Sequence, residues 1–307
     1  MFVESDGVRL SVHERGNRSA PTVVLVHGYP DTHRVWDGIA EILAEEFHVV
    51  TYDVRGAGAS DKPSGLAAYR LPVLARDLFA VIDAVSPDGP AHVVAHDWGS
   101  IQSWEAVTTP GARIASYTSV SGPCLDHVGH WVRRRPTLAH LKQLLHSWYI
   151  VAFHLPFVAP FVWRRVLGPR WGRLLRRMEG ARSHVAPSVV DDGVRGMSLY
   201  RANFIPRIRA PRDRRTDLPV LLVQLLRDKY VTAGTLEDVE RWAPNLRRRV
   251  LDAGHWAPVT HARPLALLVA DHVVANHVTA HTTTDAPTPG PHAPHSAPGS
   301  TTSSRRP

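Results

Sequence analysis

The feature that most constrains the fold is a set of short valine- and leucine-rich runs, each ending in glycine or polar residues. Continuous apolar runs of this length are typical of strands buried on both faces, as in a parallel sheet. Helical patterns lie between several of them, including residues 35–47 and 71–85. We therefore expect an α/β fold, with a mostly parallel twisted sheet and helices on both faces. The runs are TVVLVHG (22–28), HVVTYDVRG (48–56), HVVAHDWG (92–99), SYTSVSG (116–122), PVLLVQLLRD (219–228) and RRVLDAGH (248–255).

This alternation of strands and helices divides the chain into parts. Residues 1–124 are expected to form the first part of the core, opening with a β-hairpin. Over residues 125–217 the alternation stops, and a sequence rich in Trp, Arg and Pro indicates an inserted helical cap. The core is expected to resume over 218–278. Residues 279–307 are rich in Thr, Pro, His and Ser and are expected to be a disordered tail.

The charge of the chain limits the classes of partner that we expect, and its cysteine content indicates a compartment. The formal net charge is +8, from 36 basic and 28 acidic residues. No nucleic-acid-binding module accompanies this charge, so we expect arginines on solvated helix faces and no nucleic-acid partner. The single cysteine, Cys124, excludes an internal disulfide and fits a reducing, cytoplasmic compartment. The N-terminus shows no apolar run of signal-peptide length.

One segment is apolar enough to be compared with a membrane span. A spanning helix needs about 20 apolar residues with few interruptions. Residues 144–163 are strongly apolar but include two histidines and two prolines. We therefore favour a lid that faces substrate or lipid, which makes peripheral membrane contact through the cap an expectation.

Polar residues whose side chains can take part in catalysis follow three of the predicted strands, in the chain order Asp97, Asp228, His255. In an open α/β sheet, ligands bind beyond the carboxyl ends of the strands, so these side chains are expected to meet there. The order is that of nucleophile, acid and histidine in hydrolases with such sheets. Small residues, Ala95 and Gly99, flank Asp97 where a larger side chain would collide in a sharp turn.

Several motifs together resemble the epoxide hydrolase branch of the α/β-hydrolase superfamily. They are HGYP (27–30), RGAGASDKP (55–63), HDWG (96–99) and GHW (254–256), and the resemblance covers roughly residues 1–275. It implies the α/β-hydrolase fold with an inserted cap. SVSGPCLDH also resembles bacterial hydrolase domains fused to a short-chain dehydrogenase. The GAG of residues 56–58 is too short for a dinucleotide fingerprint, so we expect no cofactor and no metal.

An aspartate at this corner has different chemistry from a serine. A carboxylate with a reference pKa of about 3.9 is already ionised at neutral pH and needs no base before it attacks. Attack on saturated carbon gives an ester whose carbonyl belongs to Asp97, and water activated by His255 can cleave it. Asp97 therefore indicates an alkylating substrate, either an epoxide or an alkyl halide.

Backbone and phenol groups are expected to complete the site. The N–H of Trp98, directly after the nucleophile, is one candidate oxyanion donor. The resemblance assigns the second to the N–H of Tyr29. An epoxide oxygen leaves as an alkoxide and needs a proton, which a phenol can supply. The resemblance assigns this acid pair to Tyr149, in Ser-Trp-Tyr, and Tyr200, in Leu-Tyr-Arg-Ala-Asn.

The main alternative is a haloalkane dehalogenase with the same Asp97 nucleophile. That family usually has Asn or Glu after His-Gly to help hold the halide, and Tyr29 cannot do so. Fluoroacetate dehalogenases have a motif resembling HDRG at the corner, and Trp98 does not match the third position of that motif. A non-catalytic ligand-binding hydrolase fold usually lacks a triad member, and none is lacking here. The expected partner is a small-molecule epoxide.

Two further choices concern the acid and the substrate. Asp126, which follows the strand before the cap, competes with Asp228 because some relatives place the acid there. Asp228 follows the strand PVLLVQ, where the resemblance places the acid, so we favour Asp228. The cap is apolar and rich in arginine, which suggests a long, lipid-like epoxide. The sequence makes no prediction of oligomeric state or stereochemistry.

Overall fold

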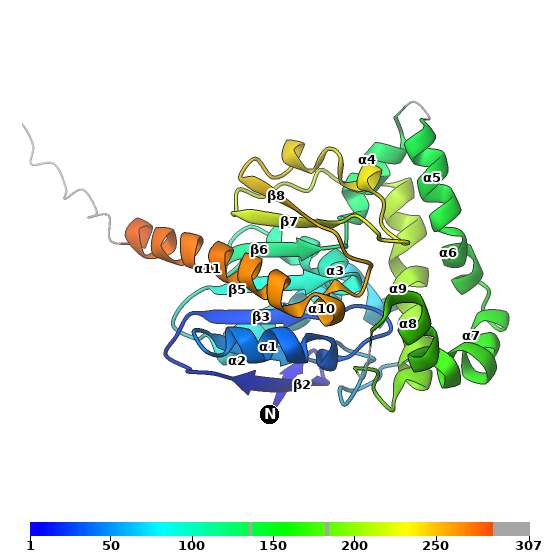
Figure 1. The fold of residues 1–307 in the computed structure, drawn as a ribbon, viewed down its shortest axis with the longest axis horizontal. Coiled ribbons are helices and arrows are strands. Elements are labelled where there is room, and N and C mark those ends of the chain that lie inside the picture. The colour runs from blue at the N-terminus through cyan, green and yellow to red at the C-terminus, as the bar shows by residue number, and fades with distance from the viewer. Residues whose placement is uncertain (135–136, 182–183, 285–307) are drawn as a thin grey trace, which may run out of the picture.

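A computed structural model describes residues 1–134, 137–181 and 184–284. Its centre is an eight-stranded sheet in the order β1-β2-β4-β3-β5-β6-β7-β8 (Figure 1). The β1–β2 and β2–β4 pairs are antiparallel, and the pairings from β4 to β8 are parallel. The strands are β1 (Phe2–Ser5), β2 (Val8–Arg15), β3 (Thr22–Val26), β4 (His48–Tyr52), β5 (Ala91–His96), β6 (Ile114–Val120), β7 (Val220–Leu225) and β8 (Leu246–Leu251).

The central strands are buried on both faces, as the continuous apolar runs predicted. In β3, Val24 and Val26 belong to one hydrophobic cluster, and Val23 and Leu25 belong to the cluster on the other face. All four side chains are fully buried. Because side chains alternate across a strand, an unbroken apolar run supplies both layers of core. The predicted α/β fold with a mostly parallel sheet is confirmed.

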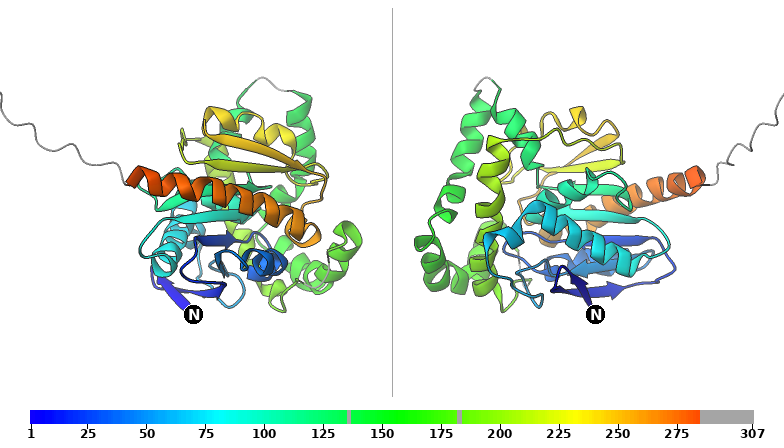
Figure 2. Two further views of the ribbon diagram at one scale, coloured as in Figure 1. Left: turned by 60° about the vertical axis from the view of Figure 1, so that its left-hand side comes forward. Right: turned by 180° about the vertical axis from the view of Figure 1, so that it is seen from behind.

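Helices cover both faces of the sheet. Figures 1 and 2 show α1 (Asp37–Leu43), α10 (Ala257–Thr260) and α11 (Ala262–Thr284) on one face. The opposite face is covered by α2 (Leu71–Val85) and α3 (Trp98–Val107). In α2, apolar residues at helical spacing are buried against the sheet. Short turns of 3₁₀ helix complete the core: η1 (His33–Trp36), η2 (Leu66–Tyr69), η5 (Ala233–Leu236) and η6 (Val239–Arg241).

The helix α11 continues to Thr284, past the expected start of a disordered tail at 279. This part of the expectation is corrected, because a helix anchored by buried Leu265, Val269 and Val273 extends into the polar sequence. The rest of the expected tail, residues 285–307, lies outside the described residues.

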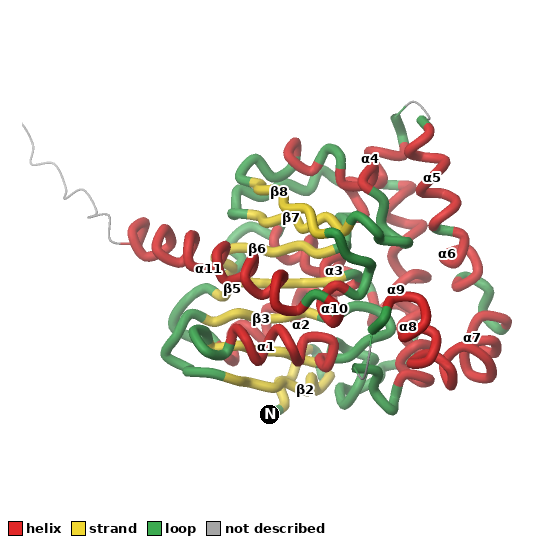
Figure 3. The backbone as a smooth tube through the Cα atoms, in the orientation of Figure 1, coloured by secondary structure: helices red, strands yellow, loops and turns green. Residues whose placement is uncertain are grey.

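A separate group of helices lies between β6 and β7 in the chain, beside the end of the sheet where the parallel strands finish (Figures 1 and 3). The apolar segment 144–163 is divided among short helices here, and no helix in the described part of the chain is long and apolar enough to cross a bilayer. The elements are α4 (Leu125–Val132), α5 (Leu138–His146), α6 (Trp148–Phe153), α7 (Val158–Val162), η3 (Trp163–Leu167), η4 (Gly168–Arg170), α8 (Trp171–Glu179) and α9 (Val189–Arg209).

A buried ion-pair network joins α9 to the core helices. Arg207 binds Glu105 at 2.9 Å and Asp126 at 3.0 Å, and all three side chains are largely buried. The backbone N–H of Arg212 donates to Asp126 at 3.0 Å, and Arg214 pairs with Glu105. Arg207 and Arg214 therefore depart from the expectation of solvated faces, because their guanidinium groups pair with buried carboxylates. Removing one partner of such a network leaves a buried charge uncompensated.

Candidate active site

Asp97 occupies the sharp corner between β5 and α3. Its backbone adopts φ 52° and ψ −124°, a strained conformation for a residue with a side chain. Packing at the corner is tight, because a Cβ on Gly99 would lie 2.2 Å from the carbonyl oxygen of Val26. A Cβ on Gly28 would lie 2.4 Å from Oδ1 of Asp97. Glycine at both positions lets the loop after β3 approach the carboxylate closely.

His255 lies between two carboxylates that come from other strand ends. Its Nε2 is 3.4 Å from Oδ2 of Asp97, and its Nδ1 is 3.0 Å from Oδ2 of Asp228. Asp97 follows β5, Asp228 follows β7 and His255 follows β8. The structure thus brings together the three residues that the strand-end argument selected. The competing acid, Asp126, is held by Arg207 and the backbone of Arg212 instead.

Hydrogen bonds hold Asp228 as an anion. Its Oδ1 accepts the backbone N–H of Tyr230 at 2.7 Å and of Val231 at 3.0 Å, and its Oδ2 accepts the hydroxyl of Ser121. Burial by itself would raise the pKa of Asp228, but the charge of His255 and these hydrogen bonds lower it to about 2. Asp228 is therefore ionised at neutral pH.

The same arrangement keeps a proton on His255. Burial favours the neutral imidazole, yet Asp228 and Asp97 together raise the pKa of His255 to about 10. The backbone of His255 is also held in place, because Nε2 of His96 donates to the backbone carbonyl of His255 at 2.8 Å. His255 is accordingly an imidazolium at neutral pH.

Tyr29 contacts Asp97 through its backbone. The Tyr29 N–H donates to Oδ1 of Asp97 at 2.8 Å. The Tyr29 hydroxyl points away to α9, where it donates to the carbonyl of Gly193 at 2.9 Å. Trp98 is the first residue of α3, which places its N–H among the amides left unpaired at a helix N-terminus. Its ring packs against Tyr200, with centroids 4.7 Å apart.

Phenols from two inserted helices share a cavity with Asp97. Tyr149 lies on α6 and Tyr200 on α9, with ring centroids 6.0 Å apart. Burial, followed by the nearby charge of Asp97, raises the pKa of Tyr149 well above its usual value. Burial also raises the pKa of Tyr200, with Tyr149 and Asp97 contributing. Both side chains are therefore neutral hydrogen-bond donors at physiological pH.

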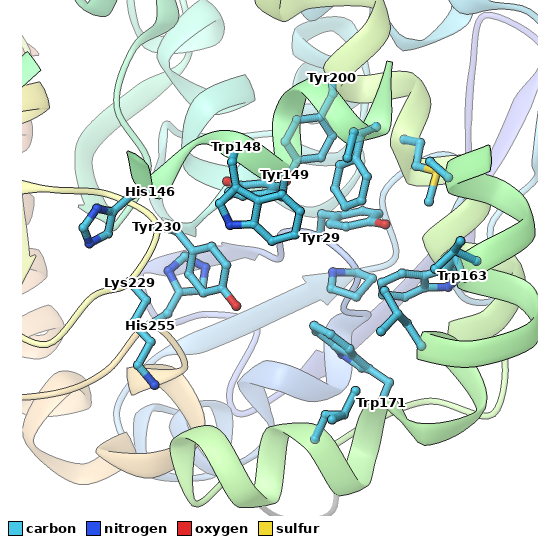
Figure 4. Close-up of a pocket in the computed structure, with 18 of the residues that line it drawn as sticks. Tyr29, His146, Trp148, Tyr149, Trp163, Trp171, Tyr200, Lys229, Tyr230 and His255 are labelled. Atoms are coloured by element: carbon cyan, nitrogen blue, oxygen red, sulfur yellow. The ribbon is translucent and has the colours of Figure 1, made fainter. Parts of the chain in front are cut away.

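The cavity around these groups has a volume of about 740 Å³ and is walled mostly by apolar side chains. Figure 4 shows Tyr149, Tyr200 and Trp163 of the inserted helices gathered around the same space as His255 and Tyr230 of the core loops. An apolar pocket with a few convergent polar groups is typical of small-molecule sites. Other lining residues are Trp148, Phe153, Leu155, Val158, Trp171 and Leu174.

Within the described ranges, one cluster has the spacing of metal ligands: His13, His33 and Asp53. The two imidazole rings are stacked, with centroids 3.9 Å apart and planes 24° apart. Ring nitrogens bind metals in the ring plane, so stacked rings cannot aim at one ion. Asp53 already accepts hydrogen bonds from Nδ1 of His33 at 2.7 Å and from the N–H of Ala59 at 2.9 Å. The cluster is better explained by these internal bonds.

A family model for the alpha/beta hydrolase fold matches residues 21–262. The chain belongs to the α/β-hydrolase family. Epoxide hydrolase A of Mycobacterium tuberculosis is 30% identical to this hydrolase over 75% of the chain and 67% of its own length. The likeness to the epoxide hydrolase branch, expected from the motifs, is confirmed.

A more similar relative is longer than this hydrolase. The probable oxidoreductase EphD of Mycobacterium tuberculosis is 40% identical over 87% of this chain, but the match covers only 48% of EphD. The chain therefore spans about half the length of these curated relatives. SVSGPCLDH had predicted a resemblance to one part of a longer protein, and the partial coverage of EphD agrees with that expectation.

Solved structures show the same fold. An inhibitor complex of Bacillus megaterium epoxide hydrolase matches with a TM-score of 0.73 at 19% identity, covering 89% of this hydrolase and 100% of that chain. Epoxide hydrolase A from Mycobacterium thermoresistibile matches with a TM-score of 0.72 at 23% identity, covering 89% and 97%.

Sequence reasoning missed two polar residues at the hydrolase site. Ser121 contacts both Asp228 and, at 3.0 Å, Nδ1 of His255, from a backbone at φ 49°. It directly follows β6, so the strand-end argument used for Asp97 would have found it. Tyr230 packs beside His255 with ring centroids 4.7 Å apart. Its proximity to Asp228 in the sequence could have identified Tyr230 as a residue of the site.

Proposed function

We propose that this hydrolase converts epoxides to vicinal diols through a covalent ester on Asp97. One observation carries the proposal: the Asp97 carboxylate contacts the Tyr29 N–H and His255 while facing a cavity that also holds the phenols of Tyr149 and Tyr200. A nucleophile, a histidine for the second step and two proton donors therefore surround one space.

In the first step, an oxygen of Asp97 attacks a ring carbon of the epoxide. The carbon–oxygen bond of the ring breaks, and its electron pair goes to the leaving oxygen. That oxygen takes a proton from Tyr149 or Tyr200, so the product is a neutral hydroxy ester. The shared position of both tyrosines in the cavity supports this role.

In the second step, water attacks the Asp97 carbonyl carbon. The ester no longer carries the Asp97 charge, so one of the two groups that raised the pKa of His255 is lost. His255, still oriented by Asp228, releases its proton, and the phenolate left by the first step takes up a proton through solvent. The neutral imidazole of His255 then accepts a proton from the attacking water. The N–H groups of Tyr29 and Trp98 stabilise the resulting oxyanion. The bond between the carbonyl carbon and the diol oxygen then breaks, that oxygen takes the proton of the newly added hydroxyl, and Asp97 is restored as a carboxylate.

Two contacts favour an epoxide over an alkyl halide. A departing halide anion needs N–H donors, and the Tyr29 side chain carries none; its hydroxyl donates to the carbonyl of Gly193. Trp98 packs on Tyr200 and is not among the described residues that line the cavity. The phenols of Tyr149 and Tyr200 suit an oxygen leaving group instead. The apolar walls further support a long, lipid-like epoxide as substrate.

The buried free thiol of Cys124 is compatible with the cytoplasmic location that we propose from the sequence.

A matched substrate panel tests this proposal. Terminal, internal and fatty epoxides are offered beside 1-haloalkanes of the same chain length, while diol and halide are measured. We expect diol formation without halide release, and no activity in Asp97→Ala. Steady halide release with inert epoxides would support a dehalogenase. Tight ligand binding with no turnover would support a binding protein.

A further inference from the structure

The inserted helices carry an unusually apolar outer surface. We call it the outer apolar face, defined by Leu138, Leu144, Trp148, Val151, Phe157 and Phe161 of α5, α6, α7 and the adjoining loop. Phe157 is 84% exposed, Trp148 71% and Leu144 67%. Scattered exposed apolar residues are normal, but a group of large ones on adjacent helices marks an interaction surface.

Positive charge borders this face. Between Thr137 and Glu179 the chain has six arginines and Lys142, but Glu179 is the single carboxylate. In the described part of the structure, none of these six guanidinium groups is paired with a carboxylate. All six are exposed: Arg164, Arg165, Arg170, Arg173, Arg176 and Arg177. Their charges are therefore available to an anionic partner.

The helix α8 has apolar side chains on one side and arginine side chains on the other. Its Leu175 is fully buried, and Leu174 lines the cavity. Arg173, Arg176 and Arg177 lie on the exposed side. Because its leucines face the protein interior, α8 presents its arginines to the surroundings.

The outer apolar face is continuous with the cavity. Leu145, Trp148, Leu155, Val158 and Val162 line the cavity and are also exposed at the surface. The same cavity reaches Asp97 and His255. Apolar side chains of the cavity wall therefore connect the outer apolar face with the space in front of Asp97.

We propose that the outer apolar face docks on an anionic phospholipid surface, so that an apolar epoxide enters the cavity from the bilayer. Apolar side chains would enter the region between headgroups and acyl chains, and the bordering arginines would bind lipid phosphates. The docking depends only on this surface, whereas delivery of an epoxide rests on the proposed function.

Two other occupants fit the structure less well. A second copy of the chain, docked through the same face, would bring two arginine-rich borders together, which like-charge repulsion disfavours. A segment following α11 would start at the opposite end of the molecule, because α11 points away from α5 to α7 in both views of Figures 1 and 2. An anionic lipid surface matches both the apolar and the basic character.

Vesicle flotation of the full chain tests the docking. Vesicles of phosphatidylcholine alone are compared with vesicles in which a third of the lipid is phosphatidylglycerol. We expect the anionic vesicles to bind at least about tenfold more protein. Binding should fall when NaCl rises from about 0.1 M to about 1 M, because screening shortens from about 10 Å to 3 Å. No binding to either vesicle, or equal salt-insensitive binding to both, would overturn the proposal.

Paired variants locate the surface. Leu144→Ser/Phe157→Ser/Phe161→Ser removes exposed groups that do not line the cavity and should reduce vesicle binding about tenfold or more. The matched control, Val250→Ser/Leu267→Ser/Val274→Ser, changes exposed residues on β8 and α11 and should keep it. Thermal unfolding shows whether each variant is folded.

A second pair tests charge without altering apolar groups. Arg164→Glu/Arg165→Glu should abolish the preference for anionic vesicles, while Arg247→Glu/Arg249→Glu on β8 should retain it. Equal loss in both pairs would overturn a localised surface. If the serine triple variant dissociated a dimer and left vesicle binding unchanged, the face would be a self-interface and the proposal would be wrong.

A water-soluble epoxide separates the two proposals. The serine triple variant should hydrolyse it with unchanged kcat/KM, but should lose the advantage of wild type on vesicle-borne fatty epoxide. If wild type binds anionic vesicles as expected but hydrolyses no epoxide, docking stands and the proposed function fails. If it hydrolyses soluble epoxide but ignores vesicles, the docking inference fails alone.

Discussion

His255→Gln should stop the enzyme at a covalent intermediate while leaving attack on the epoxide intact. A carboxylate nucleophile needs no base to remove a proton before it attacks, so the first step does not require the imidazole. Release of the ester requires activated water, and His255 lies 3.4 Å from Oδ2 of Asp97 for that step. Steady turnover should fall by about 10²–10⁴-fold, the usual contribution of a general base.

Intact-protein mass measures this outcome directly. The His255→Gln protein should gain the mass of one substrate, on the peptide containing VVAHDWGS. The double variant Asp97→Ala/His255→Gln is the matched control and should gain none. Loss of adduct formation in a folded His255→Gln protein would mean that the imidazole takes part in the first attack.

The second large effect concerns the cavity phenols. Tyr149→Phe and Tyr200→Phe should each slow formation of the ester, and the double variant should nearly abolish it. General acid assistance contributes about 10²–10⁴-fold, and neutral phenols are favoured here by the raised pKa of both side chains. Hydrolysis of the ester, once formed, should change much less. Single-turnover measurement of the two steps separates these effects.

Tyr230→Phe provides the matched control for this experiment. Tyr230 lines the same cavity and packs against His255, but it lies on the loop after β7 rather than on an inserted helix. We expect ester formation in Tyr230→Phe to resemble that of wild type. Normal ester formation in both single variants, with slow formation in Tyr230→Phe, would move the acid to Tyr230.

The meeting of Asp97, Asp228 and His255 could be predicted from the sequence, because it depends on local strand patterns and on the direction of the strands. Continuous apolar runs indicated parallel strands, and parallel strands end at one edge of a sheet. Polar residues after those runs therefore had to meet, and Asp97, Asp228 and His255 do so. The glycine at position 99 could be understood in advance, since the chain must approach itself closely at the corner.

Contacts that depend on tertiary packing could not be predicted in this way. The sequence favoured Asp228 over Asp126, but the partners of Asp126 depend on where α9 places Arg207, far away in the sequence. The position of Ser121 after β6 could have been noted in advance, but its contacts with Asp228 and His255 depend on an unusual backbone conformation. The extension of α11 to Thr284 reflects apolar anchoring earlier in the helix, whereas composition alone suggested a tail.

A single turnover in heavy-oxygen water tests the central claim, that Asp97 is a nucleophile, most directly. If Asp97 forms an ester that water cleaves at the carbonyl carbon, the diol takes its new oxygen from Asp97, and water replaces that oxygen in the side chain. The heavy oxygen should therefore appear in the peptide carrying Asp97, and the first diol released should be unlabelled. Heavy oxygen in the first diol, with an unlabelled Asp97, would show that the carboxylate acts as a base and would contradict the account.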